Sequence, residues 1–291
     1  MSYSRDLIRN TLVRGLWLTV GRRNLVRLSR LLTMESRLDV GNDLDTNGER
    51  MVQERALSSV RQTPIVVFDV GANVGRWTSA LLKTSNRDKR GAVQVYCFEP
   101  AAATYQSLCD RLVALKDRVI PIQAALSNVD GEAEFNIFGD GLGINSLHLP
   151  HQSRWNSEKQ PVPTLEKVQL VTADSFCARE GIEQIALLKI DAEGHDLAVL
   201  EGARGMLEAH RIQVLQFEYN QRWIDSRHYL KDAFELLEPL GYKLGKITPR
   251  GIEFYPQWHF ELETFREGNY LACLSEHVDL FPQIRWWNLP P

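Results

Sequence analysis

The chain has 291 residues, a formal net charge of −3 and a sequence pI of about 6.2. This length can bury a full hydrophobic core, and the near-neutral charge argues against a nucleic-acid partner. No segment has the ~18 consecutive apolar residues of a membrane span, and the four cysteines lack zinc-site spacing, so we expect a cytoplasmic protein.

The first 63 residues are predicted to form a helical extension. Apolar residues recur there at helical spacing, namely Leu7, Ile8, Leu12, Leu16, Leu25, Leu28 and Leu32. Seven arginines accompany them up to Leu32, against a single acid, Asp6. Such a basic amphipathic segment can lie on an anionic membrane, which would make residues 1–33 a peripheral membrane contact. It can also cap the following domain or a second subunit in a homo-oligomer, and we favour this cap. A polar linker at 39–50 and a short helix near 49–61 are expected to follow.

From Pro64 onward, alternating strand-like and helix-like segments predict one α/β domain over 64–291. The expected strands are 65–70, 93–98, 119–125, 185–190, 212–219, 242–247, 251–255 and 269–274. The expected helices are 76–84, 101–116, 197–209 and 229–239. A turn and an alternating segment at 129–138 predict a small hairpin. Residues 139–166 show no periodicity and contain three prolines, which predicts a lid or binding loop.

A nucleoside pocket is predicted where the first two strands of this domain end. The first strand carries Asp69 at its tip and leads through a Gly71-x-Asn73-x-Gly75 turn into a helix. Glycines let the backbone turn tightly and approach a ligand closely. The second strand ends in Glu99-Pro100, an acidic tip that is placed to bind ribose hydroxyls.

The glycine pattern separates two cofactors that use such a pocket. A dinucleotide site requires G-x-G-x-x-G, in which the second glycine admits the pyrophosphate and the third allows close helix packing. Asn73 and Arg76 occupy those two places here. S-adenosylmethionine has no pyrophosphate, and a site for it can tolerate Asn73, whose amide could serve the methionine end. The pattern therefore favours S-adenosylmethionine over NAD.

Polar side chains follow two later strands of the predicted sheet. The two-residue period of a strand places Lys189 and Asp191 on one face, and Gln216, Glu218 and Asn220 together on the next strand. If these strands are neighbours, the five groups meet at the carboxyl edge, where open α/β folds bind ligands. A buried lysine is costly unless it is paired, so Lys189 is either in a structural ion pair or part of the site. Because the groups cluster, we favour the site.

Taken together, these residues resemble the FkbM-type methyltransferases over roughly residues 64–274. The matching runs are Phe-Asp-Val-Gly-Ala-Asn-Val-Gly (68–75), Phe-Glu-Pro (98–100), Ala-Leu-Ser-Asn-x-Asp-Gly (125–131), Leu-Lys-Ile-Asp-Ala-Glu-Gly-His-Asp (188–196) and Leu-Glu-Gly-Ala (200–203). The resemblance implies a Rossmann-like class I methyltransferase fold, with a mainly parallel twisted sheet and a C-terminal antiparallel hairpin. It also implies S-adenosylmethionine as the methyl donor and a hydroxyl on a sugar, glycan or other natural product as the acceptor.

The resemblance also implies the cofactor contacts. The methionine part would be held by Asp69, Gly71, Ala72, Asn73 and Gly75. Glu99 would take the ribose hydroxyls, and Pro100 would shape the turn after it. Ala125, Leu126 and Ser127 would border the adenine, while Asn145 and Ser146 in the long loop would close over the methionine end.

Methyl transfer from a sulfonium requires alignment, exclusion of water and removal of a proton from the acceptor oxygen. His195, at the start of the helix after the 185–190 strand, is our first candidate for the base, although it could simply pack or cap that helix. Lys189 is the second candidate, as a base or a charge stabiliser. A Mg²⁺ ion offers another route, because Asp191, Glu218 and Asn220 are similar in kind and place to the ligands of catechol-type methyltransferases. Glu218 could instead pair with Lys189.

The sequence thus predicts an S-adenosylmethionine-dependent O-methyltransferase that acts on a sugar, glycan or natural product. The alternatives are a binding protein whose methyltransferase fold has lost its activity, and an NAD-linked oxidoreductase. Aromatic side chains with polar tips could form the acceptor pocket and favour a sugar weakly. They are His148, His151, Trp155, Trp223, Tyr229, Trp258 and His259.

Overall fold

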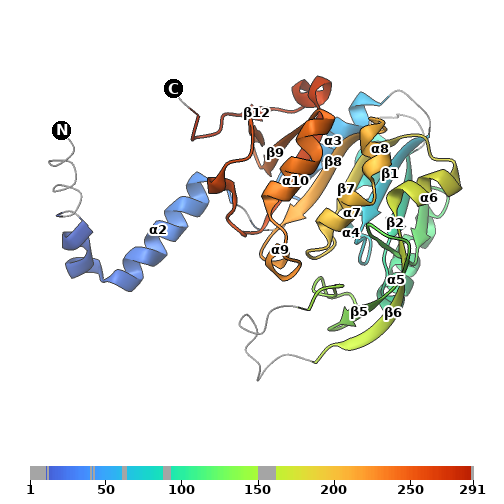
Figure 1. Cartoon of the computed structure of the whole chain (residues 1–291), viewed down its shortest axis with the longest axis horizontal. Coiled ribbons are helices and arrows are strands. Elements are labelled where there is room, and N and C mark those ends of the chain that lie inside the picture. The colour runs from blue at the N-terminus through green and yellow to red at the C-terminus, as the bar shows by residue number, and fades with distance from the viewer. Residues whose placement is uncertain are drawn as a thin grey trace. The chain divides into compact units, whose positions relative to one another are not determined.

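The computed structural model describes residues 11, 13–39, 41, 43–60, 64–87, 93–149 and 162–289, which fall into two compact units, Met1–Val40 and Gly41–Pro291 (Figure 1). The first unit contains helix α2 (Arg22–Ser36). At 100° per residue, Leu25, Leu28 and Leu32 share one stripe of α2, opposite a face that carries Arg23, Arg27 and Arg30. The amphipathic pattern predicted for this segment is therefore present in the described helix. No helix among the described residues is long and apolar enough to cross a membrane.

The larger unit begins before residue 64, earlier than we predicted from the sequence. Helix α3 (Glu49–Ser59) belongs to it, because Val52, Ala56 and Leu57 are buried in the same core as residues of the central strands. The helix covers one face of the sheet, and this removes its apolar side from water. The segment before Pro64 was predicted as part of the extension because a short helix shows no local sign of what it packs against.

A nine-stranded sheet forms the centre of the larger unit, in the order β12-β10-β9-β11-β8-β7-β1-β2-β3. Its strands are β1 (Ile65–Val70), β2 (Val93–Phe98), β3 (Val119–Ile122), β7 (Ile185–Ile190), β8 (Ile212–Tyr219), β9 (Tyr242–Thr248), β10 (Gly251–Phe254), β11 (Gly268–Leu274) and β12 (Gln283–Ile284). The block from β8 to β3 is parallel. Strand β11 runs antiparallel between β8 and β9, and β9 and β10 form an antiparallel hairpin. The predicted class, a mainly parallel α/β sheet with a C-terminal hairpin, is confirmed.

Helices cover both faces of this sheet (Figure 1). The helices after α3 are α4 (Arg76–Arg87), α5 (Ala102–Leu112), α6 (Ala173–Glu180), α7 (Asp196–Glu201), α8 (Arg204–Glu208), α9 (Arg222–Asp225) and α10 (Leu230–Leu237), with short 3-10 turns at Val113–Leu115, Glu238–Leu240, Phe260–Leu262 and Ser275–Leu280. Two apolar cores result, one beneath α3, α4 and α5 and the other beneath α6, α7, α8 and α10. Strands β1 and β7 are buried along their whole length, which explains their continuous apolar runs.

A second, three-stranded sheet lies in the order β4-β6-β5 and corrects three predictions. Its strands are β4 (Ala125–Leu126), β5 (Gly131–Ile137) and β6 (Thr164–Val171). The predicted strand 119–125 is divided between the two sheets. The predicted hairpin at 129–138 is wrong, because β5 pairs along its length with β6, across the long loop. That loop is also shorter than 139–166, since β6 begins at Thr164. Strand β6 escaped prediction because its sequence, Thr-Leu-Glu-Lys-Val-Gln-Leu-Val, mixes polar and apolar residues without a regular alternation or a long apolar run.

The predicted helix 197–209 is divided into α7 and α8 by the sequence Gly202-Ala203. A Cβ atom on Gly202 would lie 1.9 Å from the carbonyl oxygen of Ser127. Only glycine permits this approach, which brings the end of β4 against the start of α8. The close packing joins the small sheet to the helices beside the carboxyl edge of the large one.

Candidate active site

A cavity lies at the carboxyl ends of β1, β2 and β7, where open α/β sheets bind ligands. The main sheet forms its floor, and the small sheet and the segment 139–149 form its walls. Its lining residues are Val70, Gly71, Asn73, Phe98, Glu99, Pro100, Thr104, Ala124, Ala125, Leu126, Phe135, Leu142, Gly143, Asn145, Leu147, Asp191, Ala192, Glu193 and His195. Most of the predicted cofactor residues are thus brought together in one place.

Glu99 is fixed at the tip of β2. One carboxylate oxygen accepts a hydrogen bond from the backbone N–H of Asn73 at 3.0 Å, and the other accepts from the N–H of Ala101 at 3.1 Å. Burial raises the pKa of Glu99 to about 7, against the effect of these two bonds. Each carboxylate oxygen keeps acceptor capacity for a further donor. The side chain is therefore preorganised for a ligand that offers two hydroxyl groups, as a ribose does.

The turn after β1 needs its glycines for two different contacts. A Cβ on Gly71 would lie 1.9 Å from the carbonyl oxygen of Asp191, so this glycine lets the tips of β1 and β7 touch. A Cβ on Gly75 would lie 2.8 Å from methyl groups of Leu108 and Leu112, so Gly75 lets α4 approach α5. Gly71 lines the cavity, whereas Gly75 acts through helix packing.

The amide of Asn73 is already engaged within the protein. Its oxygen accepts a hydrogen bond from the N–H of Val74 at 2.7 Å, and its nitrogen donates to the carbonyl of Gly141 at 3.3 Å. The residue adopts a φ of +48°, which asparagine tolerates better than most residues. Asn73 thus ties the turn to the segment 139–149, in addition to presenting its backbone N–H to Glu99.

Beneath the cavity, Lys189 lies between two carboxylates. Its Nζ is 3.2 Å from Asp69 and 3.4 Å from Asp191. Asp69 is fully buried and also accepts a hydrogen bond of 2.6 Å from the hydroxyl of Thr78. Burial alone would lower the pKa of Lys189, but the carboxylates outweigh it and raise the pKa above its usual value. A lysine that stays protonated cannot accept a proton. Lys189 therefore supports the site through its positive charge, which pairs with Asp69 and Asp191. Asp69 and Lys189 lie beneath the cavity and support its floor, but they are not among the residues that line the cavity.

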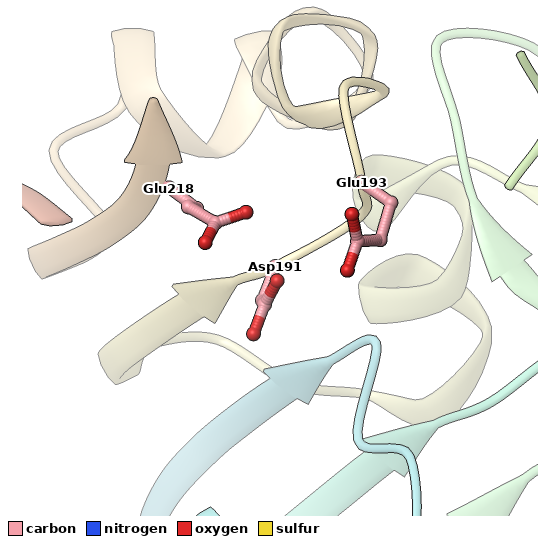
Figure 2. Close-up of side chains that lie close together, drawn as sticks. All are labelled: Asp191, Glu193 and Glu218. Atoms are coloured by element: carbon pink, nitrogen blue, oxygen red, sulfur yellow. The ribbon is translucent and has the colours of Figure 1, made fainter. Parts of the chain in front are cut away.

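Three carboxylates, Asp191, Glu193 and Glu218, point toward one another at the carboxyl ends of β7 and β8 (Figure 2). One ligand atom from each lies within 4.8 Å of the others. Arg222 pairs with Glu193 at 3.2 Å. The amide nitrogen of Asn220 donates to Glu218 at 2.6 Å, and its oxygen accepts from the N–H of Arg222 at 2.7 Å. The amide oxygen of Asn220 is therefore engaged, and Glu193 takes the place that we predicted for Asn220 in a metal-binding set.

Two carboxyl groups of this cluster, Glu193 and Glu218, have raised pKa values. Burial, followed by the charge of Asp191, raises the pKa of Glu193 to about 8, although Arg222 opposes the shift. Burial, followed by the charges of Asp191 and Glu193, raises the pKa of Glu218 well above its usual value. A cation or a hydrogen-bond donor from a ligand would relieve this repulsion. The cluster can therefore receive a hydroxyl-rich acceptor or a divalent ion.

His195 lines the cavity, as expected, but both of its ring nitrogens are engaged. Nε2 lies 2.9 Å from the hydroxyl of Ser127, and Nδ1 lies 3.1 Å from Nε2 of His148. Burial lowers the pKa of His195 to about 4, with smaller contributions from His148 and His228. The imidazole is thus neutral at physiological pH. It can accept a proton from a substrate only when one of its two contacts is released.

The segment 139–149, which contains Asn145 and Ser146, lies beside the cavity. Asn145 lines the cavity, and its amide accepts from the N–H of Phe138 at 2.8 Å and donates to the carbonyl of Gly139 at 2.9 Å. The hydroxyl of Ser146 donates to the carbonyl of Glu193 at 2.9 Å. Asn145 therefore shapes the segment, and Ser146 ties it to the loop after β7.

One of the five polar groups expected at the sheet edge is directed elsewhere. The amide of Gln216 donates to Glu49 of α3 at 2.6 Å. Glu49 also accepts from the amides of Asn47 and Asn269, at 2.6 and 3.2 Å. This buried polar set fastens α3 to the sheet. Sequence reasoning missed Glu49 because it lies in a segment that resembled a linker, and nothing local signals its distant partners.

The predicted aromatic acceptor residues are dispersed. Trp223 is 1% exposed and belongs to the hydrophobic core, whereas Tyr229 exposes 54% of its surface at the start of α10. Trp258 and His259 are half-buried between β10 and β11. His148 contacts His195, as described above. Two members of the predicted set lie outside the described residues, namely His151 and Trp155.

Comparison with known proteins shows the family of this chain. The family model described as methyltransferase FkbM domain matches residues 69–244, which include most of the cavity lining. The 2-O-methyltransferase NoeI of Sinorhizobium fredii is 26% identical over 212 residues, covering 69% of this chain and 82% of the relative. The hexuronic acid methyltransferase AglP of Haloferax volcanii is 23% identical over 184 residues, covering 63% and 68%. The crystal structure of a methyltransferase FkbM from Methylobacillus flagellatus aligns with a TM-score of 0.45 at 16% identity, covering 75% of this chain but only 47% of that one. The chain belongs to the methyltransferase FkbM family.

Proposed function

We propose that this protein transfers a methyl group from S-adenosylmethionine to a hydroxyl group of a sugar or glycan. The observation that carries the proposal is the juxtaposition, in one cavity, of Glu99 at one end and the group Asp191, Glu193 and His195 at the other. The first end suits a nucleoside, and the second suits a polar acceptor. Family membership supplies the reaction class.

The residues that line the cavity suit the methyl donor chemically. Glu99 would bind the ribose hydroxyls, and the apolar side chains of Phe98 and Leu126 would pack against the adenine. Gly71 lets the tips of β1 and β7 touch at the cavity, because a Cβ there would lie 1.9 Å from the carbonyl oxygen of Asp191. The bound donor would supply an electrophilic methyl group on a sulfonium, and the protein would align it with the acceptor and exclude water.

A sugar hydroxyl is the acceptor that we favour. The two relatives are named for a 2-O position and for a hexuronic acid. The carboxylates of Asp191, Glu193 and Glu218 are strong hydrogen-bond acceptors for vicinal hydroxyl groups. These three carboxylates lie at the ends of β7 and β8, whereas Glu99 lies at the end of β2. The acceptor would therefore bind near β7 and β8, beside the donor.

Activation of the hydroxyl has two routes in this site. In the first, His195 releases one of its two contacts and takes the proton. Lys189 balances the negative charge of Asp191 beside it. In the second, Asp191, Glu193 and Glu218 would hold a Mg²⁺ ion, which would lower the pKa of the hydroxyl. We favour the first route.

The test is turnover of S-adenosylmethionine with a panel of sugars and glycans, with S-adenosylhomocysteine and acceptor mass as readouts. A product heavier by one methylene group supports the proposal. Binding of S-adenosylmethionine without product from any acceptor would instead indicate a fold that has lost its activity, and binding of NAD in its place would indicate an oxidoreductase. His195→Ala should lower the rate about 10²–10⁴-fold if His195 is the base, with no effect of a chelator. Loss of turnover on chelation, restored by Mg²⁺, would select the metal route.

For the basic segment at residues 1–33, we propose a cap on the catalytic unit or on a second subunit. Deletion of residues 1–40 should then lower the melting temperature or dissociate an oligomer. Salt-sensitive cosedimentation of the full-length protein with anionic vesicles would overturn the cap and support a membrane contact.

A further inference from the structure

His148 reaches across from the segment 139–149 to the start of α7. Its Nε2 lies 3.1 Å from Nδ1 of His195, and the two rings are 5.2 Å apart between centroids. The sequence indicated His148 only as one of several aromatic residues of an acceptor pocket, and the family resemblance gives it no role. It is nevertheless the side chain of this segment that makes direct contact with the first candidate base.

Two hydrogen-bond arrangements fit the contacts of His195. The oxygen of the Ser127 hydroxyl lies 2.9 Å from Nε2 of His195 and 3.4 Å from the amide oxygen of Asn128, and the hydroxyl has one proton to donate. A neutral imidazole carries a single N–H, so in each arrangement one ring nitrogen of His195 donates and the other accepts. When Ser127 directs its proton to Asn128, Nε2–H of His195 donates to Ser127 and Nδ1 accepts from Nε2–H of His148, and His148 is then the donor on which the tautomer of His195 depends.

Ser146 connects the same segment to the loop after β7. Its hydroxyl donates to the carbonyl of Glu193 at 2.9 Å and accepts from the N–H of His148 at 3.1 Å. The backbone of Ser146 also pairs with Asn136 through two hydrogen bonds, which join it to the small sheet. These hydrogen bonds fix the backbone of His148, and this places its ring against His195.

We propose that His148 is a positioning residue, which fixes the ring of His195 in one tautomer and holds the segment 139–149 closed over the cavity. The segment contributes Leu142, Gly143, Asn145 and Leu147 to the cavity wall, so its closure would retain a bound nucleoside. The second part rests on the proposed function, because it needs the cavity to hold the methyl donor. The first part stands on the geometry of the free protein.

Two variants isolate the donated hydrogen bond. In His148→Gln, the amide nitrogen of glutamine replaces Nε2–H as a donor at similar reach, whereas His148→Met is of similar length and has no donor. Leu149→Ala is the control, because Leu149 lies next in the same segment, is 62% exposed and does not line the cavity. If the Met variant does not fold, His148→Asn, whose amide is one bond shorter, takes its place.

The first measurement is ¹⁵N NMR of the ring nitrogens of His195 in the free protein. We expect the Nε2–H tautomer in the wild type, the Gln variant and the Leu149→Ala control, and a mixture of tautomers in the Met variant. The second is the dissociation rate of S-adenosylhomocysteine by stopped-flow. We expect a three- to tenfold rise in the Met variant, the size of one lost hydrogen bond, and rescue to within about twofold in the Gln variant.

Unchanged ring signals of His195 in the Met variant would overturn the positioning role. An unchanged dissociation rate, or one that rises equally in the Gln variant, would overturn the closure. If the wild type does not bind S-adenosylhomocysteine, the proposed function fails, and the NMR comparison still decides whether His148 positions His195.

Discussion

Replacement of Lys189 by methionine tests whether this residue supports the site by charge or takes part in proton transfer. The side chain is only 6% exposed and lies 3.2 Å from Asp69 and 3.4 Å from Asp191. Methionine fills a similar volume without the charge. The fully buried carboxylate of Asp69 then keeps one hydrogen bond, from Thr78, and loses its ion pair.

The cost can be bounded from above. Removal of one partner from a buried ion pair costs roughly 3–5 kcal/mol. The variant can also relieve the lone carboxylate by protonating it. At pH 7 this costs about three pKa units for an ordinary aspartate, or about 4 kcal/mol. At pH 5 the same protonation costs only about 1.5 kcal/mol. We therefore expect Lys189→Met to lose about 3–4 kcal/mol near neutral pH and about half of that, or less, at pH 5.

The assay is urea unfolding followed by tryptophan fluorescence at both pH values. Lys243→Met is the matched control, since Lys243 is an exposed lysine on β9 and its loss should cost less than about 0.5 kcal/mol. The double variant Asp69→Asn with Lys189→Met removes both charges and should regain most of the loss. A loss below about 1 kcal/mol, or an equal loss at both pH values, would refute the ion-pair reasoning. Restored stability without restored turnover in the double variant would show that Lys189 or Asp69 acts in the chemistry itself.

Three further outcomes are expected. Glu99→Ala should weaken S-adenosylmethionine binding by about 1.5–3 kcal/mol for each charge-assisted hydrogen bond lost, and unchanged affinity in calorimetry would remove Glu99 from the ribose site. Gly71→Ala should destabilise the fold by at least about 1–3 kcal/mol, because its Cβ would meet the carbonyl of Asp191 at 1.9 Å, and a wild-type melting temperature would contradict this close approach. Because the folded-state pKa of Glu193 is raised to about 8, its contribution to stability is present below the unfolded value and is lost as pH rises toward 8. Glu193→Gln should therefore flatten the fall in stability between about pH 5.5 and 7.5 by about 1.4 kcal/mol per pH unit, as measured by denaturation at several pH values.

Much of the fold could be predicted from the sequence, because its signals are local. Strands β1 and β7 are buried on both faces, so their residues are continuously apolar and the runs are visible without a partner. Gly71 and Gly75 stand in a short turn pattern directly after their strand, and Glu99 ends its strand in a short recognisable run. Each of these features depends on residues that are neighbours in the chain, and the parallel order of the strands then brings their tips together.

The small sheet could not be predicted in the same way. Strand β5 pairs with β6 across the segment that separates them, and Gly131 at the start of β5 lies opposite Leu170 near the end of β6. Much of β6 is exposed, and its sequence mixes polar and apolar residues without a regular period, so it resembles a loop. The pairing is decided by a partner more than 25 residues away, which no local pattern contains.

The sequence by itself determined the residue types of the site, and the tertiary structure decided what each of them does. Lys189 and His195 were both candidate bases, but Asp69 and Asp191 keep the first protonated, and Ser127 and His148 occupy both nitrogens of the second. Asp191 follows Lys189 at the end of the same strand, whereas Asp69, Ser127 and His148 come from β1, from the end of β4 and from the segment 139–149. The charge and hydrogen-bonding state of a buried side chain depends on the groups that surround it in space, and the chain order does not record which groups those are.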